Sequence, residues 1–282
     1  MMPNPRIGVC SWSLRPRDPR QLVGALQGLG IENVQLALVP VVAEPAVWGQ
    51  ATEILAAAGV RVISGMLAMK GEDYSTLDSI RLTGGVRCDA GWPENAKLAE
   101  AVAEAAGRAG LRLVTLHAGF LDDPSLDDAA RLTMLDRLRA VVDLFAARGV
   151  NVAFETGQET ADTLLDVLDR LDRPTAGVNF DPANMILYGM GDPVQALRRL
   201  GPRVVQVHVK DALGSGRPGS WGREVPAGHG EVDWDALFEV ALRIDPPVNF
   251  IIEREGSTGV PADIADARAL IERRLAPGRC RS

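Results

Sequence analysis

Four acidic or imidazole side chains stand in a fixed order at the ends of short apolar stretches. The stretches read NVAFET, AGVNFD, VVQVHVKD and VNFIIE, and the side chains are Glu155, Asp181, His208 and Glu253. Successive residues of a strand point to opposite faces, so alternating Val, Ile and Phe assign one face to a core and leave these four on the other. Three converging carboxylates repel one another unless a cation offsets that cost. The order therefore predicts one divalent metal ion, with Mn2+ favoured and Mg2+, Co2+ or Zn2+ as the other options.

Two further polar side chains lie on the same inward faces. Lys210 comes two residues after His208, and His117 ends the inward face of LVTLHAG. Lys210 can stabilise developing negative charge or pair with Glu253, and a purely structural salt bridge is the alternative. His117 can hydrogen-bond a substrate, and a satisfied interior histidine is the alternative.

The elements that must position these residues follow a repeated pattern of apolar strand, polar loop and amphipathic helix. The expected strands are Arg6–Ser13, Asn33–Leu38, Val60–Met66, Leu111–His117, Val150–Thr156, Thr175–Asp181, Val204–Lys210 and Val248–Arg254. The expected helices are Pro19–Leu29, Pro45–Ala58, Glu94–Ala109, Leu126–Arg148, Thr160–Leu171, Pro193–Leu200, Asp233–Ile244 and Pro261–Arg274. Eight such units predict parallel strands joined by helical crossovers. We therefore expect an α/β chain that forms a single (β/α)8 TIM-barrel domain over residues 1–282.

An open doubly wound sheet is the alternative fold. That fold usually begins with a glycine-rich fingerprint after its first strand, and CSWSLRP is not one. In a barrel, the carboxyl ends of the strands meet at one mouth, where barrel active sites lie. Two long segments that follow strands, Leu67–Pro93 and Asp211–Val232, are expected at this mouth as lids or binding loops.

Composition restricts the partners and the compartment. The 282 residues are 46% hydrophobic and 24% charged, the balance of a soluble globular protein, and the net charge of −7 disfavours general nucleic-acid binding. Three cysteines, Cys10, Cys88 and Cys280, form no CxxC pair and suit a reducing cytoplasm. The sequence MMPNPRIGVCSW lacks the pattern of a signal peptide, and no apolar run reaches roughly 18 residues, so we expect no membrane partner.

The chain resembles the xylose-isomerase-like barrels grouped as sugar phosphate isomerases and epimerases, a family that includes the AP-endonuclease-type barrels. The resemblance spans nearly the whole chain and rests on FETG, NFDPAN, HVKDA, the G-x-G-x-VDW stretch Gly228–Trp234, and IIERE. It implies a metal-dependent epimerase, isomerase or dehydratase that acts on a keto-sugar, an aldo-sugar or a cyclitol. It also implies that Glu155 and Glu253 both bind the metal and move protons.

The sequence departs from two subgroups of this family. The endonuclease-type members resemble a three-zinc site rich in histidine, whereas the histidines here are His117, His208 and His229. The family's Asp-x-x-His reads Asp181-Pro-Ala-Asn184, and its Asp-x-His reads Gly222-Arg-Glu224. A DNA-repair hydrolase is therefore disfavoured. Asn184 can still hydrogen-bond a substrate hydroxyl, but membership of the ketose 3-epimerases, which carry that histidine, stays open.

The expected geometry predicts proton-transfer chemistry next to a carbonyl group. The ion would bind the carbonyl and a neighbouring hydroxyl of a sugar and stabilise the enediolate. Glu155 and Glu253, on strands that are not neighbours, would stand on opposite sides of the sugar, so that removal and return of the proton gives epimerisation. Return to the adjacent carbon gives isomerisation, and loss of a β-hydroxyl or glycosidic oxygen gives a dehydratase or lyase. The sequence does not separate these outcomes, and a non-catalytic sugar-binding barrel is a further alternative.

Aromatic and basic residues of the loops are candidate contacts to the sugar or polyol partner. Trp12, Trp92 and Trp221 can stack on a sugar ring, although tryptophan more often packs in the interior. Arg217 and Arg223 can clamp a phosphate or carboxylate, although solvated loop arginines are commoner. No motif identifies the sugar or its phosphorylation state. A homo-oligomer is typical of the family, but a sequence shows no symmetry.

Overall fold

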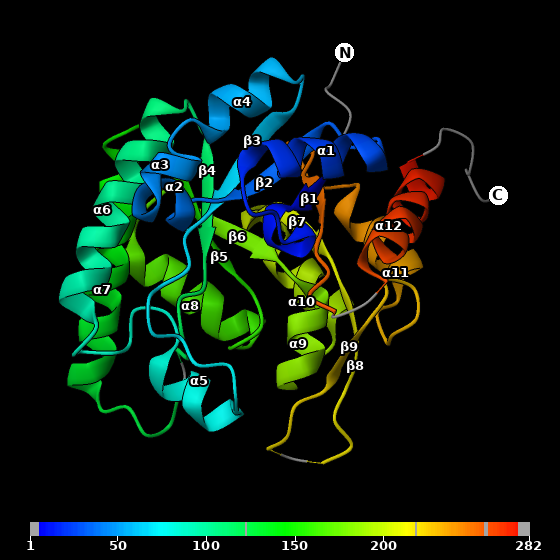
Figure 1. The fold of residues 1–282 in the computed structure, drawn as a ribbon. Coiled ribbons are helices and arrows are strands. Elements are labelled where there is room, and N and C mark those ends of the chain that lie inside the picture. The colour runs from blue at the N-terminus through cyan, green and yellow to red at the C-terminus, as the bar shows by residue number, and fades with distance from the viewer. Residues whose placement is uncertain (1–5, 122, 218, 257–258, 276–282) are drawn as a thin grey trace.

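Eight parallel strands close into a barrel in the computed structural model, which describes residues 6–121, 123–217, 219–256 and 259–275 (Figure 1). The strands follow one another around the barrel in the order β1-β10-β7-β6-β5-β4-β3-β2. Their bounds are β1 Ile7–Cys10, β2 Asn33–Ala37, β3 Arg61–Met66, β4 Leu113–Leu116, β5 Asn151–Glu155, β6 Ala176–Phe180, β7 Val204–Val209 and β10 Asn249–Ile252. The predicted (β/α)8 fold is confirmed, and each predicted strand is present with narrower bounds. The first strand ends early because Ser11–Leu14 form a 3-10 helix.

Helices connect consecutive barrel strands and surround the barrel (Figure 1). Asp18 caps the first of them and Asp192 caps another, because each side chain accepts hydrogen bonds from first-turn backbone N–H groups. No helix within the described residues is long and apolar enough to cross a membrane. The helices that match predicted ones are α1 Pro19–Leu29, α6 Trp92–Arg108, α7 Asp128–Ala146, α8 Ala161–Leu171, α10 Pro193–Leu200, α11 Trp234–Ala241 and α12 Val260–Leu275.

The predicted continuous helix Pro45–Ala58 is wrong. Two short helices take its place, α3 Pro45–Trp48 and α4 Ala51–Ala57, and a further short helix, α2 Val39–Ala43, comes before them. Gln50, between α3 and α4, has φ −109° and ψ 21°, outside the helical region, and the glycine before it, Gly49, has a low helix propensity. The chain therefore does not run from α3 into α4 as one helix.

Both long segments predicted as mouth loops contain regular structure. Helix α5 Leu77–Thr83 lies inside the first, and strands β8 Asp211–Leu213 and β9 Arg223–Val225 pair antiparallel in the second. A further short helix, α9 Pro182–Tyr188, follows β6 directly. All of these elements extend from the same end of the barrel, at the bottom of Figure 1. This end is the mouth, since it follows the carboxyl ends of the strands.

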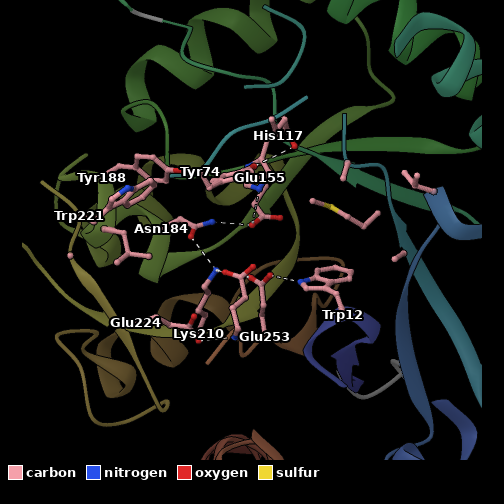
Figure 2. Close-up of a pocket in the computed structure, with 18 of the residues that line it drawn as sticks. Trp12, Tyr74, His117, Glu155, Asn184, Tyr188, Lys210, Trp221, Glu224 and Glu253 are labelled. Atoms are coloured by element: carbon pink, nitrogen blue, oxygen red, sulfur yellow. Dashed lines mark hydrogen bonds and ion pairs between the residues drawn. The ribbon is translucent and has the colours of Figure 1, made fainter. Parts of the chain in front are cut away.

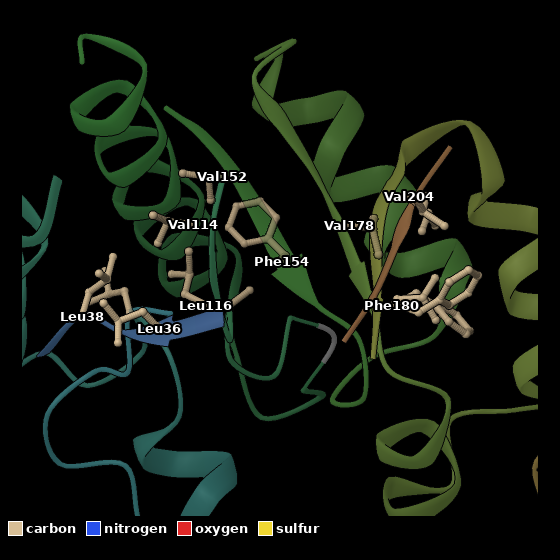
Figure 3. Packing of buried hydrophobic residues seen from close by; sticks show 14 of the residues in the cluster. Leu36, Leu38, Val114, Leu116, Val152, Phe154, Val178, Phe180 and Val204 are labelled. Carbon is tan, nitrogen blue, oxygen red and sulfur yellow. The ribbon is translucent and has the colours of Figure 1, made fainter. Parts of the chain in front are cut away.

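The apolar core lies between the barrel and the helices, as the alternation of strand residues predicts. Val152, Phe154, Val178 and Phe180 are fully buried and belong to one apolar cluster that also contains residues of the surrounding helices (Figure 3). The opposite faces of the same strands carry polar residues such as Asn179, which is also fully buried. The barrel interior is therefore a polar layer enclosed by an apolar one.

Candidate metal centre

The four candidate metal ligands meet at the mouth end of the barrel interior. Glu155 ends β5, Asp181 follows β6 and caps α9, His208 lies in β7 and Glu253 follows β10. One ligand atom of each lies within 4.8 Å of the others. His208 Nδ1 is 3.6 Å from Glu155 Oε1, 3.5 Å from Asp181 Oδ2 and 3.2 Å from Glu253 Oε2. The fold thus brings together four buried groups that are far apart in the sequence.

Two buried atoms of this cluster, His208 Nδ1 and Asp181 Oδ2, have no hydrogen-bond partner among the described residues. His208 Nε2 lies 2.8 Å from Gln35 Oε1 and 3.1 Å from Asn179 Nδ2, and the closer of the two is an acceptor, so we infer that a neutral ring carries its proton on Nε2. The lone pair of Nδ1 then points toward the carboxylates. One imidazole lone pair and three carboxylates at this spacing fit a divalent ion.

The charges of the cluster are unbalanced without such a cation. Burial is the largest influence on the pKa of Asp181 and raises it to about 6, opposed by Lys210 and supported by Glu253. Burial alone would lower the pKa of His208, but the surrounding carboxylates, Glu155 foremost, raise it well above its usual value. The cluster therefore retains protons, and a divalent ion would displace them.

Polar side chains inside the barrel hold the cluster from below. Gln206 Nε2 donates to Gln35 Oε1 at 3.2 Å and to Asn179 Oδ1 at 3.1 Å, while Ser64 Oγ donates to Gln206 Oε1 at 2.7 Å. Asn179 Nδ2 in turn donates to Glu155 Oε2 at 3.1 Å. These hydrogen bonds fix the rotamers of the groups that contact His208 and Glu155, as the outer partners of metal ligands do.

A chain of hydrogen bonds links Glu155 to Glu253 across the top of the cluster (Figure 2). Asn184 Nδ2 donates to Glu155 Oε1 at 3.0 Å, and Asn184 Oδ1 accepts from Lys210 Nζ at 3.3 Å. Lys210 Nζ also donates to Glu253 Oε2 at 3.2 Å, which confirms the predicted pairing. Trp12 Nε1 donates to Glu253 Oε1 at 2.7 Å. Both carboxylates are therefore held in place, Glu155 by amides and Glu253 by an ammonium group and an indole.

A cavity of about 720 Å3 opens above the cluster, within the size range of small-molecule sites. Seven of the predicted site residues line it: Trp12, His117, Glu155, Asn184, Lys210, Trp221 and Glu253. Asp181 and His208 are fully buried beneath them. Arg223 is exposed on β9 and is not among the lining residues, although its neighbours Gly222 and Glu224 are.

Five lining residues with carboxylate or phenol side chains are not among the site residues predicted from the sequence: Glu72, Tyr74, Tyr188, Glu224 and Glu255. Two of them carried a usable signal. Glu255 lies two residues after Glu253, and Tyr188 lies one helical turn after Asn184 on the same face of α9. Trp92, by contrast, begins α6 outside the cavity, where its ring centroid lies 5.1 Å from the guanidinium of Arg137.

The hairpin that supplies Trp221 and Glu224 to the cavity is anchored by Asp211. This buried carboxylate accepts hydrogen bonds from Gly228 N at 2.8 Å and from Trp234 Nε1 at 2.9 Å. A Cβ atom on Gly230 would lie 2.0 Å from Asp211 Oδ1, so only glycine fits there. The glycine-rich stretch before Trp234 is thus explained by close packing around one carboxylate.

The chain belongs to the xylose isomerase-like TIM barrel family, whose model matches residues 29–274. A xylose isomerase domain protein from Planctomyces limnophilus is 30% identical, with a TM-score of 0.86 over 96% of this chain and 98% of that one. The 3-keto-D-glucoside 4-epimerase from E. coli is 17% identical, with a TM-score of 0.70 over 97% of this chain and 100% of that one, and shares the fold. The resemblance inferred from the motifs is confirmed.

One curated relative is a 3-oxo-isoapionate decarboxylase from Pectobacterium atrosepticum. It is 29% identical over 135 residues, which cover 46% of this chain and 46% of that protein. The chain therefore matches about half the length of this relative.

Proposed function

We propose that this chain is a divalent-metal-dependent isomerase or epimerase that moves a proton next to the carbonyl group of a sugar or related polyol. The observation that carries the proposal is the buried cluster of Glu155, Asp181, His208 and Glu253, in which two atoms have no hydrogen-bond partner within the described part of the chain. The cluster lies at the base of a cavity that also exposes a histidine and several aromatic rings. A site of this kind suits a ligand rich in hydroxyl groups.

The chain's own residues divide the work in this proposal. A divalent ion held by the four ligands supplies a Lewis acid for the negative charge that develops on a carbonyl oxygen. Glu155 and Glu253 come from β5 and β10, which are not neighbours in the barrel, so the two carboxylates can reach different sides of a bound sugar. One removes the proton from carbon and the other returns it.

Three further residues position the substrate and these carboxylates. Trp12 and Lys210 fix the two oxygens of Glu253 through hydrogen bonds of 2.7 and 3.2 Å. His117 lines the cavity with a buried Nδ1 that has no partner among the described residues, and so can hydrogen-bond a substrate hydroxyl. Manganese is the ion we expect, because the donor set is mostly oxygen.

A lyase is the second candidate function, and the curated decarboxylase relative favours it. Loss of carbon dioxide from a 3-oxo acid leaves negative charge next to a carbonyl group, and removal of the proton beside the carbonyl of a keto-sugar creates the same charge before a β-hydroxyl leaves. The same cluster would stabilise that charge. The two functions therefore differ in which bond to carbon breaks, and product analysis separates them.

Metal content beside proton exchange tests the proposal. We expect the wild-type chain to hold a single Mn, Mg, Co or Zn ion and the Asp181→Asn variant to lose it. Asp192→Asn is the matched control, because Asp192 also caps a helix that begins with proline but lies outside the cluster. Asparagine retains the capping hydrogen bond in both variants, so a difference in metal content reflects coordination.

The metal-loaded protein is then incubated with a panel of keto-sugars in D2O. Deuterium on carbon of the recovered sugar supports isomerase or epimerase chemistry and identifies the carbon. Release of water or carbon dioxide from the substrate would instead support the lyase and contradict the isomerase or epimerase. If the wild-type chain binds no divalent ion after incubation with these metals, both candidate functions are contradicted.

A further inference from the structure

The lining of the cavity is strongly acidic. Five glutamates line it: Glu72, Glu155, Glu224, Glu253 and Glu255. Within the described part of the chain, Lys210 is the single lysine or arginine side chain among the lining residues. Arg217 and Arg223, the two arginines considered as a phosphate clamp, are exposed and do not line this cavity.

The one lining ammonium group is already saturated. Lys210 is 4% exposed, and its Nζ contacts Glu255 Oε2 at 2.9 Å, Glu253 Oε2 at 3.2 Å and Asn184 Oδ1 at 3.3 Å. An ammonium group has three hydrogens to donate, so these acceptors occupy all of them. An anionic substrate would have to displace one of these partners to reach the charge.

A divalent ion in the cluster does not reverse the sign of the site. Arg254 lies behind the wall and pairs with Glu224 Oε1 at 2.7 Å, while it also pairs with Asp263 Oδ2 at 2.8 Å. The lining and the cluster together contain six carboxylates. The ion, Lys210 and Arg254 carry fewer than six positive charges between them, so the site stays negative. A phosphate group brought into this space would meet net repulsion.

Uncharged groups of a ligand would have complementary partners in the same cavity. Trp221 Nε1 and His117 Nδ1 are buried, belong to lining residues and have no hydrogen-bond partner among the described residues. Trp12 and Met66 add apolar surface for the C–H faces of a ring. Figure 2 shows Trp221 and Tyr188 on one side of the acidic groups and Trp12 on the other.

We propose that the substrate is an uncharged keto-sugar or polyol that carries neither a phosphate nor a carboxylate. This inference rests on the proposed function and narrows its substrate class. It also separates this chain from the curated relative, whose name specifies an oxo acid as substrate.

Binding to the Mn2+-loaded chain tests the inference independently of turnover. Matched pairs of ligands are titrated by calorimetry: free ketohexoses beside their 6-phosphates, and the same sugars beside their uronic acids. We expect the neutral member to bind at least about tenfold more tightly in the pairs that bind. A preference for the anionic member, equal affinity, or binding of no neutral member overturns the inference. Tight neutral binding without deuterium exchange supports it while contradicting the proposed function.

A single charge-neutralising variant sharpens this test. Glu72→Gln keeps the oxygen that accepts from Gly85 N at 2.9 Å but removes one negative charge from the wall. We expect the preference for neutral over phosphorylated ligands to fall by about tenfold. Asp78→Asn, the same change at an exposed site of the same segment, is the control and leaves the preference unchanged. Equal preferences in the wild-type and Glu72→Gln chains would contradict the role of wall charge.

Discussion

The floor and the wall of the cavity are built by different means. The floor consists of Glu155, Asp181, His208 and Glu253, which lie in or directly after barrel strands and are at most 6% exposed. The wall comes from the segments between strands and includes Tyr74, which is 44% exposed, and the side chain of Glu255, which is 56% exposed. Floor groups are fixed by strand pairing and interior hydrogen bonds, whereas wall groups depend on loop conformation.

This difference separates two roles of the site. A closed barrel keeps the relative positions of strand residues almost independent of the loops, so the floor can conserve one kind of chemistry. Loops tolerate changes of sequence and length, so the wall can change which substrate reaches that chemistry. We therefore expect substitutions in the floor to abolish metal binding or turnover, and substitutions in the wall to alter selectivity.

The largest effect is expected from a pair of glutamates that share one lysine. Glu253 and Glu255 both contact Lys210 Nζ, at 3.2 and 2.9 Å, but only Glu253 belongs to the floor. Glu253→Gln should lower kcat by about 10²–10⁴-fold with metal retained, because a proton-transfer group is lost. Glu255→Gln should change kcat by less than about tenfold. Similar losses in both variants, measured on the substrate identified by exchange, would erase the distinction between floor and wall.

A smaller effect is expected from the layer beneath the floor. Gln35→Leu removes the acceptor of His208 Nε2 and should weaken metal affinity by about 10–100-fold. Gln206→Leu is the matched control, because Gln206 is equally buried in the same network but has no hydrogen bond to His208. Metal titration followed by denaturant unfolding measures both variants. Comparable affinity losses would mean that the layer acts only through general stability.

The same division explains what the sequence could predict. Strand alternation converts position in the sequence into position in space, and so the four floor residues and Lys210 were predicted from their spacing. Arg223 was predicted only as a loop arginine, without such a pattern, and β9 instead pairs in a hairpin outside the barrel, with Glu224 rather than Arg223 in the cavity lining. Glu72 and Tyr74 reach the cavity through the path of a long segment, for which no periodic pattern exists. The position of the loops at the mouth was predicted, but which of their side chains face the cavity was not.

The smallest effect concerns an ion pair that joins two loops at the mouth. Asp123, which is 4% exposed, contacts the guanidinium of Arg87 and accepts from Ser125 N at 2.8 Å. Burial opposes the charged form of Asp123, but the hydrogen bond from Arg87 prevails and lowers the pKa to about 2. A carboxyl with a depressed pKa stabilises the folded chain above its unfolded pKa and ceases to do so as the pH falls through the folded value.

We therefore expect Asp123→Asn to reduce the free energy of unfolding at pH 7 by about 2 kcal/mol, which corresponds to the shift from 3.8 to about 2. The difference from wild type should shrink as the pH falls from about 4 toward 2, and denaturant unfolding at several pH values measures it. Asp78→Asn, at an exposed pair with Arg81, should show no such trend. Metal affinity at pH 7 should stay unchanged in Asp123→Asn, because a contact between loops can weaken while the barrel floor keeps its geometry. A parallel loss of metal would instead mean that the loops help to hold the floor in place.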